Sequence, residues 1–124
     1  MSDVVSKNKA LIRRIYEEMW NKAKPALAVE IFVQPAGVER FVSQFLISFP
    51  DLQHTVEEML VDGEQVAVVR FSAHGTYTGT WLHFAPTGKS IQYTGVTWAR
   101  IVNGKISEHQ TWWDKAGLIE QIGG

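Results

Sequence analysis

The sequence predicts an α+β domain in which three N-terminal helices pack on a curled antiparallel sheet formed by the second half of the chain. Two observations predict this class. Apolar residues recur at helical spacing as far as Leu46, and from Leu52 onward β-branched and aromatic runs are separated by Asp-Gly, Pro-Thr-Gly and Asn-Gly. Helices and strands are therefore segregated along the chain, which favours α+β over alternating βαβ units. No linker, repeat or low-complexity run divides the 124 residues, so we expect one domain over residues 1–124.

Three helices are expected before Pro50. The first has one apolar face and one charged face, and its apolar side chains lie three and four positions apart: Leu11, Ile12, Ile15, Tyr16, Met19 and Trp20. Pro25 suits the first turn of a short second helix that reaches about Phe32, after which Pro35 and Gly37 interrupt the pattern. A third apolar stripe starts at Val38 and predicts a helix that Pro50 ends.

The expected strands cover about residues 52–61, 65–77, 89–102 and 105–113, with an extension or bend around residues 79–84. Asp62-Gly63 and Asn103-Gly104 favour the positive φ angles of tight hairpin turns. Three helices against one curled sheet form a cone-shaped half barrel. The space between the two layers is a natural pocket for a small molecule.

Composition and charge exclude several classes of protein. The 12 Lys and Arg against 13 Asp and Glu give a net charge of -1, which leaves no basic field for nucleic acid. No stretch approaches the ~18 apolar residues of a membrane span, and the start Met1-Ser2-Asp3 lacks the basic charge of a signal peptide. We therefore expect a cytoplasmic protein that binds neither membrane nor nucleic acid. The absence of cysteine excludes disulfides, thiolate nucleophiles and cysteine-ligated zinc.

Motifs for nucleotides, metals and serine hydrolases are also missing. Gly88-Lys89-Ser90 resembles the end of a phosphate-binding loop, but the glycine required five positions earlier is His83, so a hairpin turn is the better interpretation. The four histidines show none of the close helical spacings of common metal motifs: His54, His74, His83 and His109. No Gly-x-Ser-x-Gly occurs. These absences predict neither a nucleotide site nor a metal site.

Isolated polar side chains on the pocket-lining elements are the candidate site residues. His54 has the strand parity of three apolar neighbours, namely Leu52, Val56 and Leu60. It should therefore face the interior, either as a hydrogen-bonded core histidine or as an acid/base. Tyr16 and Trp20 are expected to be core aromatics whose polar tips a ligand could use.

The last expected strand holds the densest polar and aromatic cluster. One face carries His109, Thr111 and Trp113, and the other carries Glu108, Gln110 and Trp112. Periodicity alone does not say which face is inside, because a large aromatic side chain lies on both. Asp114 follows directly and is expected to cap or tie down the terminal segment.

Seven stretches occur in the order and spacing of one known family: residues 11–21 (LIRRIYEEMWN), 49–52 (FPDL), 75–79 (GTYTG), 86–89 (PTGK), 104–109 (GKISEH), 113–114 (WD) and 117–123 (GLIEQIG). Through them nearly the whole chain resembles the SnoaL-like polyketide (ester) cyclases of the nuclear-transport-factor-2-like superfamily. The resemblance implies a cone-shaped fold, commonly dimeric through its outer sheet face. It also implies closure of a polyaromatic substrate by an aldol-type step without a cofactor, in which a carboxylate base removes a proton from carbon.

The sequence departs from the family pattern at the positions that carry this chemistry. The family's base lies two residues after the histidine of the 104–109 run, and here that position is Thr111. The partner position on the preceding strand is Thr97, so both expected ionisable groups are hydroxyls. Relatives have about ten more residues between Phe32 and Val38, so the pocket should be more open or closed by a partner subunit. Tyr77 occupies a place where relatives often carry histidine.

We therefore expect a cofactor-independent cyclase or isomerase that acts by acid/base chemistry on a small apolar or polyketide-type substrate. The alternative is a non-catalytic pocket protein or dimeric structural module, which the loss of the carboxylate at Thr111 favours. His109 is the expected general acid/base, since its ordinary pKa suits neutral pH. The alternative for His109 is a local hydrogen bond that positions Asp114 or a backbone carbonyl.

Strand parity, anchored to the positions that match the family's inward residues, sets the strand side of the expected pocket: Tyr93, Thr97, Thr111 and Trp113, together with His109. The candidates Tyr16, Trp20 and His54 complete the expected lining. Strand parity then puts Val96, Trp98 and Arg100 on the outer face of the sheet. Trp98 and Trp112 would leave a large apolar patch there, which predicts a homodimer through that face.

Overall fold

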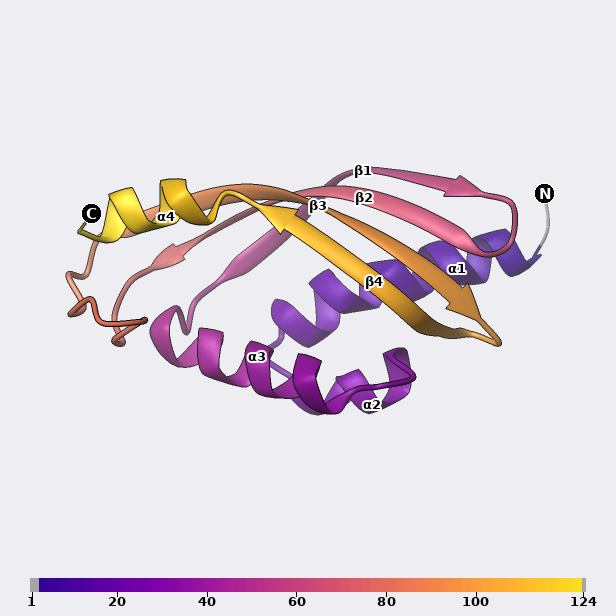
Figure 1. Cartoon of the computed structure of the whole chain (residues 1–124), viewed down its shortest axis with the longest axis horizontal. Helices are drawn as coiled ribbons and strands as arrows, with labels where there is room; N and C mark the ends of the chain where they lie inside the picture. Colours follow the sequence, from indigo (N-terminus) through magenta and orange to yellow (C-terminus); the bar gives the residue numbers. More distant parts are fainter. Residues whose placement is uncertain (1–2, 124) are drawn as a thin grey trace.

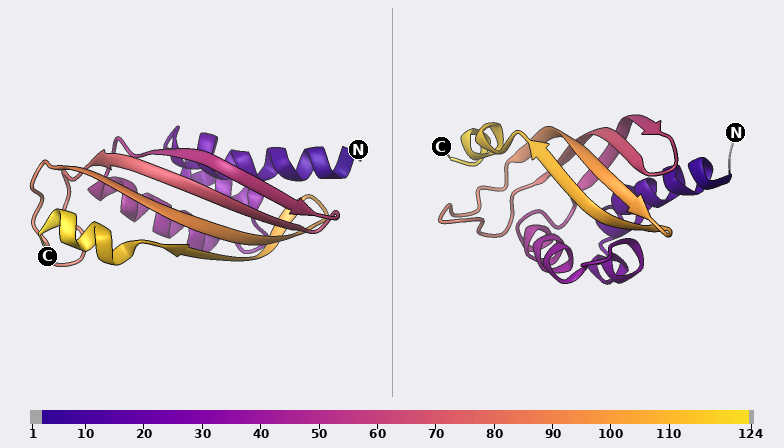
Figure 2. Two further views of the ribbon diagram at one scale, coloured as in Figure 1. Left: turned by 90° about the horizontal axis from the view of Figure 1, so that it is seen from above. Right: turned by 45° about the vertical axis from the view of Figure 1, so that its right-hand side comes forward.

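The computed structural model describes residues 3–123, and its elements confirm the α+β class. Within these residues the chain forms α1 (Asp3–Arg14), α2 (Ala28–Ile31), α3 (Ala36–Ser48), β1 (Gln53–Asp62), β2 (Val66–Thr76), β3 (Ser90–Val102), β4 (Lys105–Trp113) and α4 (Lys115–Ile122). The strands form one antiparallel sheet in the order β1-β2-β3-β4. The sheet curls over α1, α2 and α3, which lie on one of its faces (Figures 1 and 2). No helix of the described residues is long and apolar enough to cross a membrane.

The first helix is longer than α1. It continues without a break into a π-helical segment, η1 (Ile15–Trp20), and a 3-10 turn over Pro25–Leu27 leads into α2. The apolar stripe expected from the sequence forms the buried side of this first helix, because Ile15, Tyr16 and Trp20 are all buried. Short π-helical segments are rare and often occur at functional sites. This one positions Tyr16 and Trp20 beneath the sheet.

Two β-bulges decide which strand residues face the helices. The register of β1 against β2 shifts between Val56 and Glu58. His54, before the shift, is buried, whereas Leu60, after it, is 65% exposed. The expectation that Leu60 shares the inward face of His54 was therefore wrong, because one extra residue reverses strand parity.

The second bulge determines which residues of β4 face the helices. The register against β3 shifts between Arg100 and Ile101, so that Ser107 is the extra residue on β4. Ile106 is buried beneath the sheet, and the bulge turns the odd-numbered residues after it to the same side. His109 and Thr111 thus line the inner cavity.

The C-terminal segment forms a fourth helix, α4, beyond the three expected N-terminal ones. The Asp114 carboxylate accepts a hydrogen bond from the Gly117 backbone N–H at 2.9 Å and so caps its first turn. Leu118 and Ile122 are buried against the rest of the domain. The helix α4 follows directly after β4, and the C-terminus lies at the far end of α4 (Figure 1).

The short connection before α3 makes one sheet contact. Phe32 forms an isolated parallel bridge with Ile106, and the Val33 N–H donates to the Ile106 carbonyl at 2.9 Å. Residues 34 and 35 then lead directly into α3 at Ala36. This segment therefore lies beside β4 without forming a strand.

Candidate functional site

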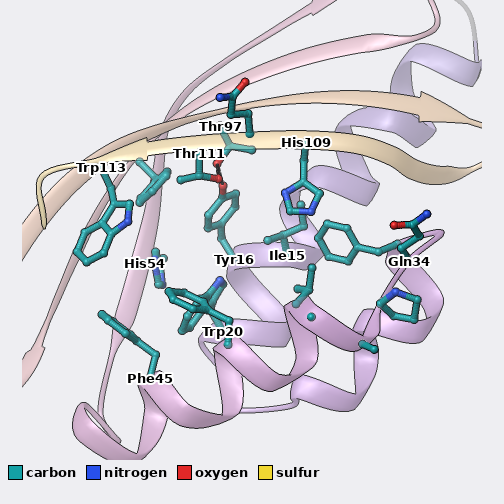
Figure 3. A pocket seen from close by; sticks show the side chains of 18 of the residues that line it. Ile15, Tyr16, Trp20, Gln34, Phe45, His54, Thr97, His109, Thr111 and Trp113 are labelled. Atoms are coloured by element: carbon teal, nitrogen blue, oxygen red, sulfur yellow. Dashed lines mark hydrogen bonds between the residues drawn. The ribbon is translucent and has the colours of Figure 1, made fainter. Parts of the chain in front are cut away.

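A cavity of about 700 Å³ lies between the helices and the inner face of the sheet. This volume is in the range of small-molecule sites. The lining is mainly aromatic, with side chains from helices and strands: Tyr16, Trp20, Phe32, Phe41, Phe45, Phe71, Tyr93 and Trp113. His109 and Thr111 on β4, and Ala36, Gly37 and Phe41 at the start of α3, line the cavity and are exposed. In the single chain the cavity therefore opens to solvent between β4 and α3 (Figure 3).

All the side chains expected in the pocket line this cavity, namely Tyr16, Trp20, His54, Tyr93, Thr97, Thr111, Trp113 and His109. Figure 3 labels all of them except Tyr93 and shows the labelled side chains converging from η1, β1, β3 and β4. Thr97 and Thr111 are directly paired in the register of β3 and β4. Val96, Trp98 and Arg100 alternate with the buried residues of β3 and are only partly buried.

Three hydroxyl groups form a chain from the core to the cavity. The Tyr16 hydroxyl donates to the Thr97 hydroxyl at 2.7 Å, and the Thr97 and Thr111 hydroxyl oxygens are 2.8 Å apart. Tyr16 and Thr97 are each 4% exposed, whereas Thr111 is exposed. Burial raises the pKa of Tyr16 to about 12, so its phenol stays protonated at neutral pH.

His54 is a buried histidine at the base of the cavity. Its backbone N–H donates to the Asn21 side-chain oxygen at 2.6 Å, and its carbonyl accepts from the Asn21 amide at 2.8 Å. Its Nε2 is 3.3 Å from the Tyr93 hydroxyl, and its Nδ1 has no hydrogen-bond partner within residues 3–123. Burial lowers the pKa of His54 to about 3, so the ring is neutral at pH 7. These contacts favour the core interpretation over an acid/base role.

His109 is more accessible than His54. Its ring contacts the Phe32 ring, with centroids 4.9 Å apart, and partial burial lowers its pKa. Among residues 3–123 no hydrogen bond joins its imidazole to Asp114, whose carboxylate caps α4 instead. The ring is thus neutral at pH 7, faces the cavity and keeps both nitrogen atoms available to a ligand.

The cavity carries no formal charge at neutral pH. Its lining contains no Asp, Glu, Lys or Arg. Its titratable side chains are two histidines, whose pKa burial lowers, and two tyrosines, whose pKa burial raises: His54, His109, Tyr16 and Tyr93. All four shifts favour the neutral form. Within the described residues, no group of three or more His, Cys, Asp or Glu side chains could hold a metal ion.

Sequence reasoning missed four phenylalanines of the lining, Phe32, Phe41, Phe45 and Phe71. Phe45 is central among them, because its ring contacts those of Trp20, Tyr93 and Trp113 as well as its helical neighbours. Phe41 and Phe45 belong to the apolar stripe of α3, so helical spacing indicated burial. That spacing could not distinguish a cavity wall from the solid core.

Comparisons with known proteins agree with this architecture. The family model for SnoaL-like polyketide cyclases matches residues 10–122. No curated protein matches the chain. Among solved structures, AclR from Streptomyces galilaeus has a TM-score of 0.86 at 22% identity, with 98% of this chain and 83% of AclR covered. TsrD from Streptomyces laurentii has a TM-score of 0.84 at 19% identity, with coverage of 99% and 98%. A SnoaL-like polyketide cyclase from Agrobacterium tumefaciens has a TM-score of 0.74 at 16% identity, with coverage of 99% and 100%. At these identities the three structures show a shared fold.

Proposed function

The chain belongs to the SnoaL-like polyketide cyclase family, and we propose that it binds a small, uncharged aromatic or polyketide-type molecule and transforms it by cofactor-independent acid/base chemistry of the cyclase or isomerase type. The uncharged, aromatic cavity carries this proposal. Its side chains offer ring faces and edges to a flat ligand, and such contacts add to the free energy of burying apolar area. A charged ligand would lose hydration there without gaining a counter-ion.

His109 is the proposed general acid/base. In an aldol-type closure its neutral imidazole would take a proton from the carbon beside a carbonyl, and the C–H electron pair would form an enolate. The enolate carbon would attack a second carbonyl of the same molecule, and the imidazolium would return the proton to the new alkoxide. Thr111 would orient a substrate oxygen by hydrogen bonding, and the buried Thr97 hydroxyl, 2.8 Å away, would hold Thr111 in place, so that neither threonine transfers a proton. No other histidine of the cavity suits this role, because the pKa of His54 is about 3.

A second candidate function is ligand binding without catalysis. The observation that favours it is the absence of any carboxylate from the cavity lining, together with hydroxyls at Thr97 and Thr111. The two candidates share the same ligand chemistry and differ in proton transfer.

Ligand charge tests the shared part of both candidates. We expect methyl anthracene-2-carboxylate to bind at least about tenfold more tightly than the anthracene-2-carboxylate anion at pH 7, because the anion loses hydration in an uncharged cavity. Fluorescence titration measures both affinities.

A matched pair of variants checks whether the preference for the ester over the anion arises in the cavity. Thr111→Lys places a cation in the cavity and should reduce the preference for the ester. Thr55→Lys adds the same charge on an exposed part of β1 that does not line the cavity, and should leave the preference unchanged. Equal affinity of the wild-type protein for ester and acid would contradict an uncharged binding site.

We also propose a homodimer through the outer face of the sheet. Leu60, Val68 and Trp98 are register partners across three strands, and Val96 is paired with Trp112. Leu60 and Trp112 are 65% and 55% exposed, which leaves a row of apolar side chains facing outward.

Sedimentation tests this interface. We expect the wild-type protein at micromolar concentration to sediment with twice the 14.0 kDa mass of the chain. Trp98→Glu, which places a charge in the apolar patch, should yield monomer. Ile47→Glu places the same charge on an exposed part of α3, away from the outer face of the sheet, and should not. A wild-type monomer at this concentration would refute the dimer.

A further inference from the structure

The hydroxyl chain has a defined direction. Tyr16 donates its proton to Thr97, so the Thr97 oxygen is an acceptor in that bond. Thr97 is buried, and the hydrogen of a buried hydroxyl needs an acceptor of its own. Within residues 3–123 the one other hydrogen-bond partner of the Thr97 hydroxyl is Thr111, at 2.8 Å. Thr97 therefore donates to Thr111, so the two bonds run in one direction, from the buried Tyr16 hydroxyl through Thr97 to the exposed Thr111 side chain (Figure 3).

This direction leaves one donor without a partner. The Thr111 oxygen accepts from Thr97, and its own O–H makes no other hydrogen bond to the described residues. Thr111 lines the cavity and is exposed, so a ligand can reach this O–H. The other hydroxyl of the lining, that of Tyr93, lies 3.3 Å from His54 and is already engaged.

We propose that Tyr16, Thr97 and Thr111 form a one-way relay of hydrogen bonds whose last O–H, on Thr111, binds the carbonyl oxygen of an uncharged aromatic ketone or ester. This inference rests on the proposed function, because it names the acceptor that the ligand of the same cavity must carry. A carbonyl is the matching group, because it accepts without donating and brings no charge into the cavity. An enolate oxygen formed from that carbonyl would be held more strongly, since hydrogen bonds to charged acceptors are stronger than neutral ones.

Tyr16 and Thr97 act in this relay as positioning residues, since neither hydroxyl needs to touch the ligand. Each bond in a chain of hydrogen bonds polarises the next, so the phenol of Tyr16 strengthens the donor at Thr111. The phenol remains protonated at neutral pH because burial raises its pKa to about 12. It can therefore donate to Thr97 throughout the physiological range of pH.

Two anthracene ligands that differ at one group test the relay. 2-Acetylanthracene carries a carbonyl, and 2-ethylanthracene replaces it with a methylene group. We expect Thr111→Val to weaken binding of the ketone by about 3- to 10-fold and to leave binding of the hydrocarbon within about twofold of wild type. Fluorescence titration gives both affinities, and infrared spectroscopy of ¹³C=O-labelled ketone reports the strength of the hydrogen bond.

The carbonyl frequency separates a positioning role of Tyr16 from a merely structural one. Tyr16→Phe keeps the ring that stacks on Phe71 at 5.1 Å but removes the first donor. It should raise the carbonyl stretching frequency of the bound ketone toward that of Thr111→Val. Thr97→Val should also raise the carbonyl frequency, whereas Thr97→Ser, which keeps the hydroxyl, should give the wild-type frequency. Tyr77→Phe, which removes another buried phenol outside the cavity lining, is the matched control and should not change it.

Each outcome decides the question. If both ligands bind and the carbonyl frequency is the same in wild type, Tyr16→Phe and Thr111→Val, the relay is wrong and the proposed aromatic cavity stands. If neither ligand binds the wild-type protein, the proposed function fails and the relay fails with it. A carbonyl frequency that shifts equally in Tyr16→Phe and Tyr77→Phe would also overturn the relay, because any lost phenol would then have the same effect.

Discussion

His109→Ala is expected to slow proton abstraction from a bound ketone by about 10²–10⁴-fold, the usual contribution of a general acid/base. The imidazole faces the cavity and has no hydrogen bond to the other described residues, including Asp114. Deuterium incorporation into the activated carbon of 2-tetralone, followed by NMR in D₂O, measures the rate directly. His74→Ala is the matched control, since His74 is an exposed histidine outside the cavity lining.

The pH dependence of the exchange rate gives a second test of His109 as the base. Burial lowers the pKa of His109 below its ordinary value of about 6.5, so the neutral base form dominates at pH 7. The exchange rate of the wild-type protein should be constant above neutral pH and should fall as the pH drops through that lowered pKa. Exchange in His109→Ala at the wild-type rate would remove His109 from the mechanism.

Acidification is expected to destabilise the fold through His54. Its pKa is about 3 in the folded protein and about 6.5 when unfolded, so the unfolded chain binds more protons between these values. The free energy of unfolding should therefore decrease as pH falls below about 6.5, by about 2 kcal/mol at pH 5 and about 3 kcal/mol at pH 4. Well above pH 6.5 His54 is neutral in both states and contributes no pH dependence.

Urea unfolding at pH 7, 5 and 4 measures this loss, and His54→Gln isolates its source. Glutamine is polar but does not titrate, so the variant should lose less stability on acidification than the wild-type protein, whatever its stability at pH 7. His109 adds a contribution of the same sign in both proteins, because its pKa is also lowered. Equal losses in wild type and His54→Gln would show that the buried imidazole is not the titrating group.

Local sequence signals predicted the elements, because helical stripes and turn residues act over a few positions. Asn103 and Gly104 both have positive φ, at 50° and 77°, as their turn preference indicates. The helix α4 was missed although it carried signals of its own, an N-cap at Asp114 and apolar residues four positions apart at Leu118 and Ile122. Its length of 8 residues made the pattern too short to stand out.

The orientation of the strands and the contacts of the site depended on tertiary structure. The bulge at Ser107 turns His109 inward, and strand alternation cannot reveal an extra residue before pairing is known. Family resemblance supplied the pairing of Thr97 with Thr111. The hydrogen bond from Tyr16 to Thr97 spans 81 positions in the chain, and no local pattern indicates it.

Deuterium exchange catalysed by the wild-type protein tests most directly whether this cavity performs acid/base chemistry or only binds. 2-Tetralone is an uncharged bicyclic ketone with an activated C–H beside its carbonyl, so it carries both groups that the proposed chemistry needs. We expect it to bind, and to incorporate deuterium at that carbon faster than in buffer and in many-fold excess over the protein. Binding of 2-tetralone with exchange at the buffer rate would contradict catalysis and identify a ligand-binding protein.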